Sequence, residues 1–417
     1  MAVMIALLVG FGLSYGIEVL QVFQPSRFSS LIDVLSNSTG TLLGFVFYFV
    51  WKSKSLELYL LVHVVLCVLM SIPLQLETSF GNWDTTFPFL LGNERTGDRP
   101  WRGHISQVYI LDKAISEEEA ALAFSEKVWL ASMGASLLAL FRLTGAGIFG
   151  DQAGGVPPLI WRGEPRDFQP KESVVLGPNH WLETATPATY LTERIIKTSQ
   201  FTLGVTAATH DTIQYGPARI VSLSADPDRR NFTLGQEGGN LVFRLRTPLT
   251  GGNGAQPQLI VPKIFSTKQP QNLIITYNGS ILNLYVNGIR TPQTLELTPG
   301  AAAFGYLTER TELTMKLCKI LYYGFIFIPI GMLHSLTSKT MRAGFAVQVL
   351  ITIGGIVLSS VILEYILVSV SGKSVDFSNL LLSIVFATAS LIAFSIWSRF
   401  HKSSNEKETL FKVTRSL

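Results

Sequence analysis

Six apolar stretches, each long enough to cross a lipid bilayer, constrain this chain more than any other feature. A membrane-spanning helix needs about 20 mostly apolar residues to cross about 30 Å of hydrocarbon. Three stretches precede a long polar block and three follow it: 2–23, 31–51, 56–76, 317–336, 344–368 and 379–397. The sequence therefore predicts an α-helical transmembrane bundle of about six spans, in a 3+3 arrangement, with a domain inserted between the halves.

The composition agrees with this division of the chain. Only 15% of the residues are charged, against about 25% in soluble domains. We expect a first transmembrane half at 1–76, an inserted domain at 77–314, a second transmembrane half at 315–398 and a basic tail at 399–417. The two cysteines lie in or beside apolar runs, and the six histidines show no metal-binding spacing, so neither a disulfide framework nor a zinc site is predicted. The net charge of +4 is small, and no nucleic-acid partner is expected.

The short loops between the spans predict the orientation. Cytoplasmic loops of membrane proteins carry an excess of Lys and Arg. One side of the predicted bundle collects Lys52, Lys54, Lys339, Arg342, Arg399, Lys402, Lys407, Lys412 and Arg415. The other side has only Arg27, Lys373 and the polar block. We therefore expect a multi-pass protein of the cytoplasmic membrane, with both termini in the cytoplasm and the inserted domain outside, in the periplasm of a bacterium with two membranes.

Polar side chains interrupt the first two spans near their outer ends. Glu18 and Gln21 share one helix face, Arg27 lies in the outer loop, and Asp33 and Asn37 share a face on the first turns of the second span. A charged group in lipid costs about 2.5–3.5 kcal/mol on insertion scales, so such residues usually pair or line a wet cavity. One interpretation is an outward-facing polar pocket with two carboxylates and an arginine counter-ion. The alternative is a simple cap, in which Asp33 complements the helix dipole.

The same order of acid, base, acid and amide returns near the other end of the chain. Glu364 ends one predicted span, Lys373 lies in the following outer loop, and Asp376 and Asn379 begin the last span. The loop is shorter than in the first half. We interpret the pattern as a degenerate internal repeat, whose two halves could face each other as in transporters built from repeats.

These spacings resemble the VanZ family of small bacterial membrane proteins. The residues that carry the resemblance are Glu18, Gln21, Arg27, Asp33, Asn37, Gly40 and Gly44. The stretch from Lys316 to Leu333 is similar to the family's opening helix, although Cys318, Lys319 and Tyr323 stand where the family usually has Asp, Lys and His. The resemblance implies a place in the bacterial cell envelope and, in one branch of the family, a link to glycopeptide resistance. It does not supply a reaction.

The sequence pattern of the polar block predicts a β structure. Two β-rich runs flank Asn278-Gly279 between Asn272 and Gly288, which is the strongest short signal for a hairpin. Further strand candidates, bounded by Gly and Pro, are 201–209, 218–225, 231–236 and 240–247. Many short strands without a long helical pattern predict an all-β sandwich.

This hairpin resembles those of laminin-G-like domains, which have a concanavalin A-type jelly roll. Leu90–Glu119 resembles the end of such a domain, including a small helix with a Ser116/Glu119 capping box. Leu140–Gly155 resembles the beginning. Since the end precedes the beginning, the domain looks circularly permuted, which sandwiches tolerate because their termini often lie close together. The resemblance implies a lectin-like jelly-roll ectodomain.

Two kinds of ligand site are candidates in this block. Asp226 and Asp228 at i, i+2, and Asp151 after a glycine-rich turn, could bind Ca²⁺, which takes several oxygen ligands; solvated turns are the alternative. A second candidate is an arginine-rich loop suited to anionic glycans or phosphates. Its residues are Asn93, Arg95, Asp98, Arg99, Trp101 and Arg102. Contact with lipid headgroups or with the protein's own spans is the alternative for the loop, and the tryptophans could instead fill the core.

Three functions fit these features. The favoured one is a binding and tethering protein, whose lectin-like head recognises an envelope glycan or a partner protein. The second is an enzyme that acts on a lipid-linked envelope precursor, with Glu18 and Asp33 as acid and base. The third is a carrier that uses the repeated polar sites. No nucleophile–base pair or metal spacing is visible, which favours binding over catalysis.

Overall fold

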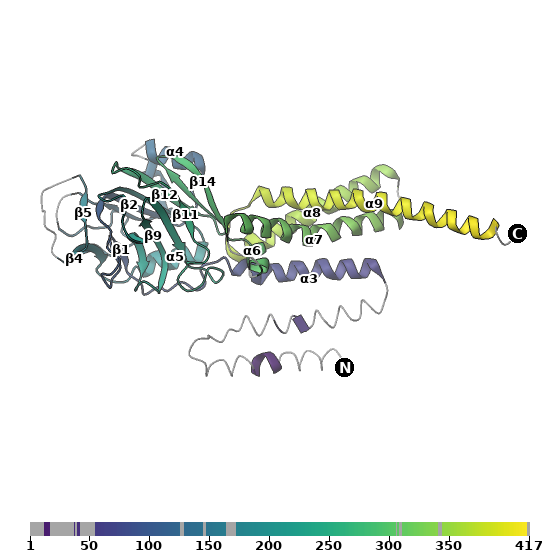
Figure 1. Cartoon of the computed structure of the whole chain (residues 1–417), viewed down its shortest axis with the longest axis horizontal. Helices are drawn as coiled ribbons and strands as arrows, with labels where there is room; N and C mark the ends of the chain where they lie inside the picture. Colours follow the sequence, from purple (N-terminus) through teal and green to yellow (C-terminus); the bar gives the residue numbers. More distant parts are fainter. Residues whose placement is uncertain are drawn as a thin grey trace. The chain divides into compact units, whose positions relative to one another are not determined.

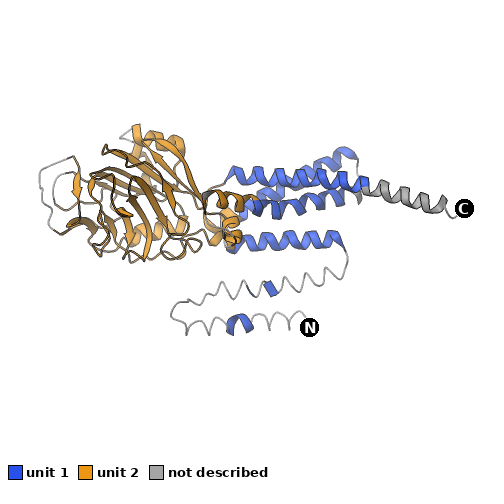
Figure 2. Cartoon of the chain, viewed as in Figure 1, with its two compact units in different colours: residues 1–73, 321–366, 376–417 blue, residues 74–320, 367–375 orange. Residues whose placement is uncertain are grey.

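The computed structural model describes residues 12–16, 37, 40–41, 55–125, 129–144, 147–163, 172–305, 307, 311–340 and 344–414. The chain divides into two compact units (Figure 2). The helical unit comprises residues 1–73, 321–366 and 376–417, and the β unit comprises residues 74–320 and 367–375.

Four helices in the described part of the chain are long and apolar enough to cross a membrane. They are α3 (Leu56–Leu76), α7 (Glu312–Thr340), α8 (Phe345–Ser371) and α9 (Phe377–Thr414). Inside a bilayer the helix is the form that pairs every backbone N–H and C=O within one segment. These helices confirm four of the predicted spans. The predicted spans at 2–23 and 31–51 lie almost wholly outside the described residues.

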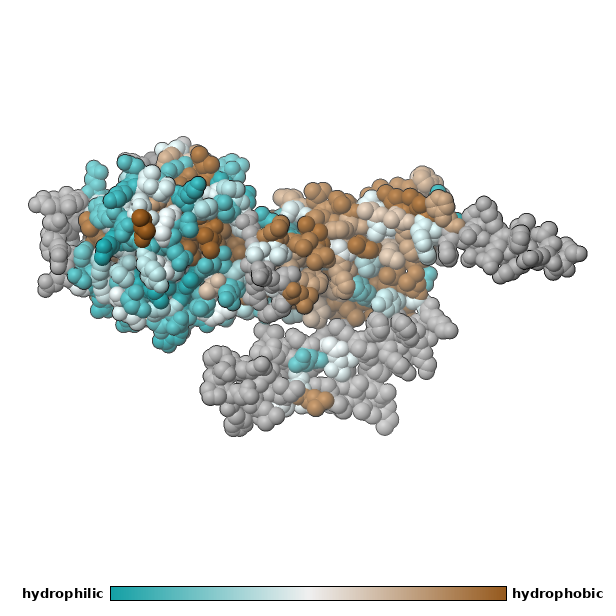
Figure 3. Space-filling model, in the orientation of Figure 1, coloured by the Kyte–Doolittle hydropathy of each residue, from teal (hydrophilic) through white to brown (hydrophobic). Residues whose placement is uncertain are grey.

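Apolar side chains on these helices face outward. Leu350 is 71% exposed and Leu358 is 59% exposed on α8, and Trp397 is 56% exposed on α9. The space-filling view shows a largely hydrophobic surface over α7, α8 and α9, whereas the surface of the sandwich is largely hydrophilic (Figure 3). An apolar surface of this extent belongs in lipid, so the chain is an integral membrane protein.

Helices α7 and α9 approach closely at small residues. Ser390 on α9 donates a hydrogen bond to the main-chain oxygen of Ile328 on α7 at 2.9 Å, and the hydroxyls of Ser335 and Ser395 lie 2.7 Å apart. A Cβ atom on Gly331 would lie 2.1 Å from the main-chain oxygen of Ala387. Small residues commonly permit such contacts between membrane helices.

The β unit contains two antiparallel sheets, each of seven strands in the described part of the chain (Figure 1). Sheet A has, in spatial order, β11 (Leu259–Val261), β10 (Asn240–Leu245), β9 (Arg230–Glu237), β8 (Ala218–Ser224), β1 (Phe89–Leu91), β6 (His180–Thr184) and β4 (Leu159–Gly163). Sheet B has β14 (Ile289–Glu296), β13 (Ile281–Val286), β12 (Gln271–Tyr277), β7 (Phe201–Thr209), β2 (Gly103–Leu111) and β3 (Leu137–Arg142), with β5 (Val174–Leu176) also paired to β2.

The two sheets pack face to face across one apolar core. The rings of Phe89 in sheet A and Phe141 in sheet B stack with centroids 6.2 Å apart. Phe232 in sheet A and Phe201 in sheet B stack at 5.9 Å. These contacts confirm the prediction of a two-sheet β domain, and β7 has the bounds predicted for it, 201–209.

The strands that come first in the sequence occupy interior positions. β1 lies between β6 and β8 in sheet A, and β2 lies between β7 on one side and β3 and β5 on the other in sheet B. An arrangement in which early strands pair with late ones is compatible with the predicted permutation.

Short helices complete the β unit: α4 (Glu117–Ser125), the 3₁₀ helix η1 (Trp129–Ser136), α5 (Thr189–Thr198) and α6 (Pro299–Phe304). The capping box at the start of α4 is confirmed. The main-chain N–H of Ser116 donates to Glu119 at 2.9 Å, and the N–H of Glu119 donates to the Ser116 hydroxyl at 3.2 Å. Helices α4 and η1 cover part of the outer face of sheet B with a second, smaller apolar cluster that includes Tyr109 and Trp129.

The turn between β12 and β13 accepts hydrogen bonds from two other segments of the β unit. Gly279 has a φ of +88°, which favours glycine, and its carbonyl accepts a hydrogen bond from the Thr78 hydroxyl at 3.0 Å. The carbonyl of Asn278 accepts one from the N–H of Ser374 at 3.2 Å. The segment that follows α3 and the loop that follows α8 are therefore fixed to the same turn.

Replacement of Gly331 by alanine tests the close approach of α7 and α9. The new methyl group would meet the carbonyl of Ala387, so we expect a loss of about 1–3 kcal/mol of stability, as overpacking usually costs. Gly324→Ala on the same helix is the matched control, because a Cβ atom there lies 3.6 Å from the nearest atom of Phe386. Thermal unfolding of both purified variants in detergent measures the difference. Equal midpoints would contradict the packing described above.

Candidate functional site

A buried carboxylate lies in the helical unit near the end of α8. Glu364 is 4% exposed. One of its oxygens accepts a hydrogen bond from the main-chain N–H of Asp376 at 3.0 Å, and the other accepts one from the side-chain amide of Asn379 at 2.9 Å. Three residues of the predicted acid–base–acid–amide set thus come together.

Asp376 immediately precedes α9 and caps its start. Its carboxylate accepts a hydrogen bond from the N–H of Ser378 at 2.9 Å, and its carbonyl accepts one from the N–H of Asn379 at 3.0 Å. A carboxylate at a helix start also complements the helix dipole. Asp376 thus has the capping role that the sequence offers as one alternative for Asp33 in the first half. Lys373, the base of the set, is 2% exposed and belongs by its contacts to the β unit.

The first half of the repeat is described only in part. Glu18, Gln21, Arg27 and Asp33 lie outside the described residues, so the pocket predicted for them stays a prediction. Asn37 is described, and its side-chain amide donates to the Ser14 hydroxyl at 3.1 Å.

The two asparagines of the predicted repeat, Asn37 and Asn379, share a local feature. The hydroxyl of Thr41 donates to the carbonyl of Asn37 at 3.0 Å, and that of Ser383 donates to the carbonyl of Asn379 at 2.7 Å. A hydroxyl four residues after the amide therefore has the same role in both halves.

A polar stripe on α3 belongs to the same unit and was missed from the sequence. His63, Cys67 and Ser71 recur every four residues and so lie on one helix face. The hydroxyl of Tyr322 on α7 donates to the Ser71 hydroxyl, and a ring nitrogen of His63 lies 2.9 Å from the carbonyl of Phe325. The regular spacing within an apolar span is the signal that could have revealed this stripe.

Two polar atoms at the site are unsatisfied. The hydroxyl of Tyr323 and the side-chain oxygen of Asn379 are buried and have no hydrogen-bond partner among the described residues. Buried polar groups are normally paired, so these two atoms are exceptions among the described residues.

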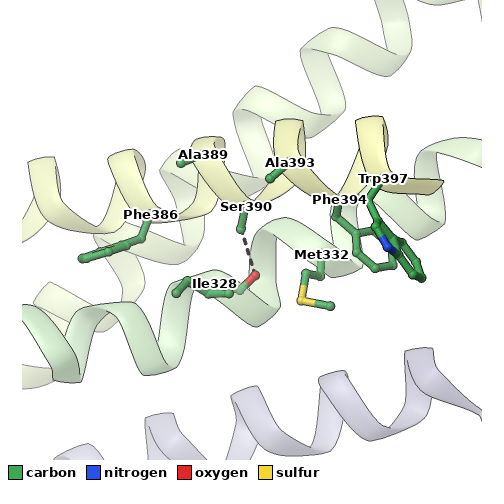
Figure 4. Close-up of a pocket in the computed structure, with 8 residues that line it drawn as sticks. All are labelled: Ile328, Met332, Phe386, Ala389, Ser390, Ala393, Phe394 and Trp397. Carbon is green, nitrogen blue, oxygen red and sulfur yellow. Dashed lines mark hydrogen bonds between the residues drawn. The ribbon is translucent and has the colours of Figure 1, made fainter. Parts of the chain in front are cut away.

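An apolar groove runs along α7 and α9 in the same unit (Figure 4). Its volume is about 480 Å³. It is lined by Ile328, Met332, Phe386, Ala389, Ser390, Ala393, Phe394 and Trp397. The Ser390 hydroxyl is already bonded to Ile328, so the groove presents almost only hydrocarbon. Such a surface suits an alkyl chain.

The β unit has a separate cleft on the outer face of sheet B. Two rows of residues cross four adjacent strands there, as the strand register shows. The polar row is Arg142, Gln107, Thr206 and Asn272, and the next row is Leu140, Tyr109, Gly204 and Ile274. Helices α4 and η1 cover the apolar row and leave the polar row open, which creates a cleft of about 440 Å³ with Phe124 and Leu130 on its wall.

The floor of the cleft also has unsatisfied groups. A Cβ atom on Gly204 would lie 2.0 Å from Cζ of Tyr109, so only glycine lets this ring lie flat on the sheet. Burial raises the pKa of Tyr109, and its hydroxyl stays a hydrogen-bond donor. That hydroxyl and the side-chain oxygen of Asn272 are buried without a partner in the described part of the chain. Donor and acceptor groups beside an apolar wall are typical of sites for polar organic ligands.

The arginine-rich loop folds across sheet A. Asn93 is buried and its side chain accepts hydrogen bonds from the N–H groups of Glu94 and Arg99, at 2.8 and 2.9 Å. Trp101 is fully buried and donates to Gln236 at 2.8 Å, so it fills the core and presents no ring to a sugar.

The charged residues of this loop remain at the surface. Arg95 forms an ion pair with Glu183 at 3.2 Å. Asp98 and Arg102 are exposed, and Arg99 is half-buried. These side chains remain candidates for binding.

Two of the three calcium candidates, Asp151 and Asp226, have structural roles, whereas Asp228 is exposed. The two oxygens of Asp151 accept four main-chain hydrogen bonds of 2.7–3.0 Å, from Leu140, Ala153, Gly155 and Val156. Asp226 accepts hydrogen bonds from the N–H groups of Asp228 and Arg229 and forms an ion pair with Arg229 at 2.7 Å. Over the described ranges, no three His, Cys, Asp or Glu side chains form a metal-binding group. Both aspartates thus hold turns.

Comparison with known proteins identifies one region of the chain. The model of the family described as VanZ/LLP1 matches residues 1–52, the segment that contains the first polar set. Neither a curated protein nor a solved structure matches the chain. The match and the four apolar helices together fit a membrane protein of the cell envelope.

Replacement of Glu364 by glutamine tests the buried carboxylate. The new amide group can accept only one of the two hydrogen bonds, so a donor is left unpaired, at a cost of about 1–3 kcal/mol. Glu57→Gln, at the exposed start of α3, is the control. We expect a lower thermal midpoint in detergent for Glu364→Gln only. If the two variants unfold together, Glu364 does not hold α8 and α9 as described.

Proposed function

We propose that this chain is an envelope receptor, anchored in the cytoplasmic membrane, whose β domain binds a glycan outside the cytoplasm. In this proposal the bundle has six spans, both termini are cytoplasmic, and the β domain is a permuted jelly roll of the lectin-like type. The arrangement of basic loop residues and the hairpin resemblance support this orientation and this domain type.

The cleft on sheet B carries the proposal. Its polar row offers a guanidinium, two amides and a hydroxyl side by side across four strands. Sugars present a dense array of hydroxyls that both donate and accept hydrogen bonds, together with apolar ring faces. The amides of Gln107 and Asn272 match the hydroxyls, and Phe124, which is 53% exposed, offers an apolar contact at the wall.

Removal of one amide from the cleft should weaken glycan binding. We expect Asn272→Ala to lower the affinity of the full-length protein about tenfold, which corresponds to one hydrogen bond of about 1.4 kcal/mol. The measurement is binding of the detergent-solubilised protein to an array of bacterial envelope oligosaccharides. Asn283→Ala is the matched control, because Asn283 lies in the same sheet on β13 and pairs with Arg290 away from the cleft. Absence of glycan binding by the wild type would reject the glycan and leave a protein partner.

A second function is favoured by the helical unit. The buried Glu364 and the unsatisfied Tyr323 and Asn379 can bind the polar part of an amphipathic molecule, and the apolar groove between α7 and α9 can hold its hydrocarbon chain. A lipid-linked envelope precursor has both parts. In this alternative the protein is an enzyme or a carrier for such a precursor.

The two functions make opposite predictions for two variants. If the helical unit binds a lipid-linked precursor, Glu364→Gln should weaken binding of a polyprenyl-linked disaccharide at least tenfold, as expected for loss of a charged hydrogen bond. Asn272→Ala should then have no effect. Native mass spectrometry of both variants, below their unfolding temperatures, makes the comparison. The reverse result would assign the glycan to the cleft.

A further inference from the structure

Three arginines lie side by side on the outer face of sheet A, which is the opposite side of the sandwich from the cleft. Arg219, Arg230 and Arg244 come from the adjacent strands β8, β9 and β10. Ser224 is opposite Arg230, and Thr233 is opposite both Ser222 and Arg244. Cross-strand neighbours point to the same side of a sheet, and the alternate residues, such as Leu223 and Phe232, fill the core. The arginines therefore share the outer face.

Only one buried acid accompanies these arginines among the described residues. Glu94 forms an ion pair with Arg219 at 2.6 Å, and its second oxygen accepts a hydrogen bond from the Ser224 hydroxyl. Arg244 donates to the neutral side chain of Gln258 at 2.7 Å. Asp98, Asp228 and Glu237 act on the cluster from exposed positions. The cluster thus has an excess of buried positive charge.

Arg230 is the arginine of this cluster whose buried nitrogens lack a partner among the described residues. It is 1% exposed, and its Nε and Nη1 atoms have no hydrogen-bond acceptor in the part of the chain that the structure describes. Burial, together with the like charges of Arg219 and Arg244, lowers the pKa of Arg230 to about 9, so the guanidinium is still charged at neutral pH. A buried charge is normally paired or coordinated.

A hydroxyl without a partner lies beside this guanidinium. Thr233 is on the same strand as Arg230, and its Oγ1 atom is buried without a partner over the described ranges. On the neighbouring strand, Arg244 is half-buried, and Arg99 lies close enough for its charge to act on Arg219 and Arg244. Arginine side chains are long and can move aside to admit a small ligand.

We propose that Arg230, Arg244 and Thr233 form a binding site for a small oxyanion of the phosphate type. Guanidinium groups bind phosphate through strong, charge-assisted hydrogen bonds. The nearly complete burial of Arg230 limits the ligand to a single anionic group, either free phosphate or the phosphate of a small ester. This site does not depend on glycan binding in the cleft, which lies on the other sheet.

Inorganic phosphate is the probe for the first test. The full-length protein in detergent is heated in phosphate-free buffer with either phosphate or chloride at equal ionic strength, and unfolding is followed by tryptophan fluorescence. Five tryptophans report on the β unit: Trp83, Trp101, Trp129, Trp161 and Trp181. We expect phosphate to raise the unfolding midpoint about 2–4 °C above the chloride value. Equal midpoints in the two salts would overturn the proposal.

Two methionine variants locate the effect. Arg230→Met should abolish the phosphate shift and, without phosphate, should be at least as stable as the wild type, because the unpaired charge is gone. Arg229→Met is the control and should keep the full shift, since Arg229 is the exposed neighbour and pairs with Asp226. A shift of the same size in Arg230→Met would refute the assignment.

A second variant covers the case in which Arg230→Met does not fold. Thr233→Val keeps every charge and the side-chain shape, so it should fold and should weaken phosphate binding about 3–10-fold through loss of one hydrogen bond. Unchanged affinity would count against the site. Glycerol 3-phosphate distinguishes the two sources of the ligand: a shift like that of phosphate indicates a phosphate ester, and no shift indicates the free ion.

Discussion

Two main-chain carbonyls in the β12–β13 turn bind two segments of the β unit that lie far apart in the sequence. The carbonyls of Asn278 and Gly279 accept hydrogen bonds from Ser374 and Thr78, which lie beyond the ends of α8 and α3. A Cβ atom on Gly279 would lie 2.9 Å from Cα of Lys373, so the loop after α8 packs directly on the turn. This loop therefore belongs to the β unit.

This connection gives the membrane carboxylate a direct covalent link to the β unit. Lys373 belongs to the β unit, whereas Asp376 and Asn379 belong to the helical unit. The main-chain N–H of Asp376 is one of the two described donors to Glu364.

The two units differ in how their buried charged side chains are paired. In the helical unit, Glu364 receives hydrogen bonds from a backbone N–H and an amide that lie within 15 residues of it in the sequence. In the β unit, Arg219 has its own acid in Glu94, but Arg230 has none in the described residues. A buried charge without a partner is costly, and Arg230 carries that cost in this structure.

The features that were predictable from the sequence are mostly local. The acid–amide pair of Glu364 and Asn379, the capping box of Ser116 and Glu119, and strand β7 each depend on neighbours within one or two elements. The cleft was not predictable, because Gln107, Arg142, Thr206 and Asn272 meet only through the register of four strands. Asp151 shows another limit: a carboxylate after a glycine-rich turn has the same sequence signal whether it binds Ca²⁺ or four backbone N–H groups. Trp101 was uncertain because its burial depends on the distant Gln236.

The interior position of β1 and β2 has a consequence for biogenesis. A strand emerging from the ribosome or the translocation channel can form a sheet only when its partners exist. β2 needs β7, which ends at Thr209, and β1 needs β8, which ends at Ser224. Most of this domain must therefore be synthesised before its first strands are protected on both edges. Nascent chains with unpaired strand edges aggregate readily. We therefore expect this protein to need chaperones that bind the unfolded chain during its synthesis.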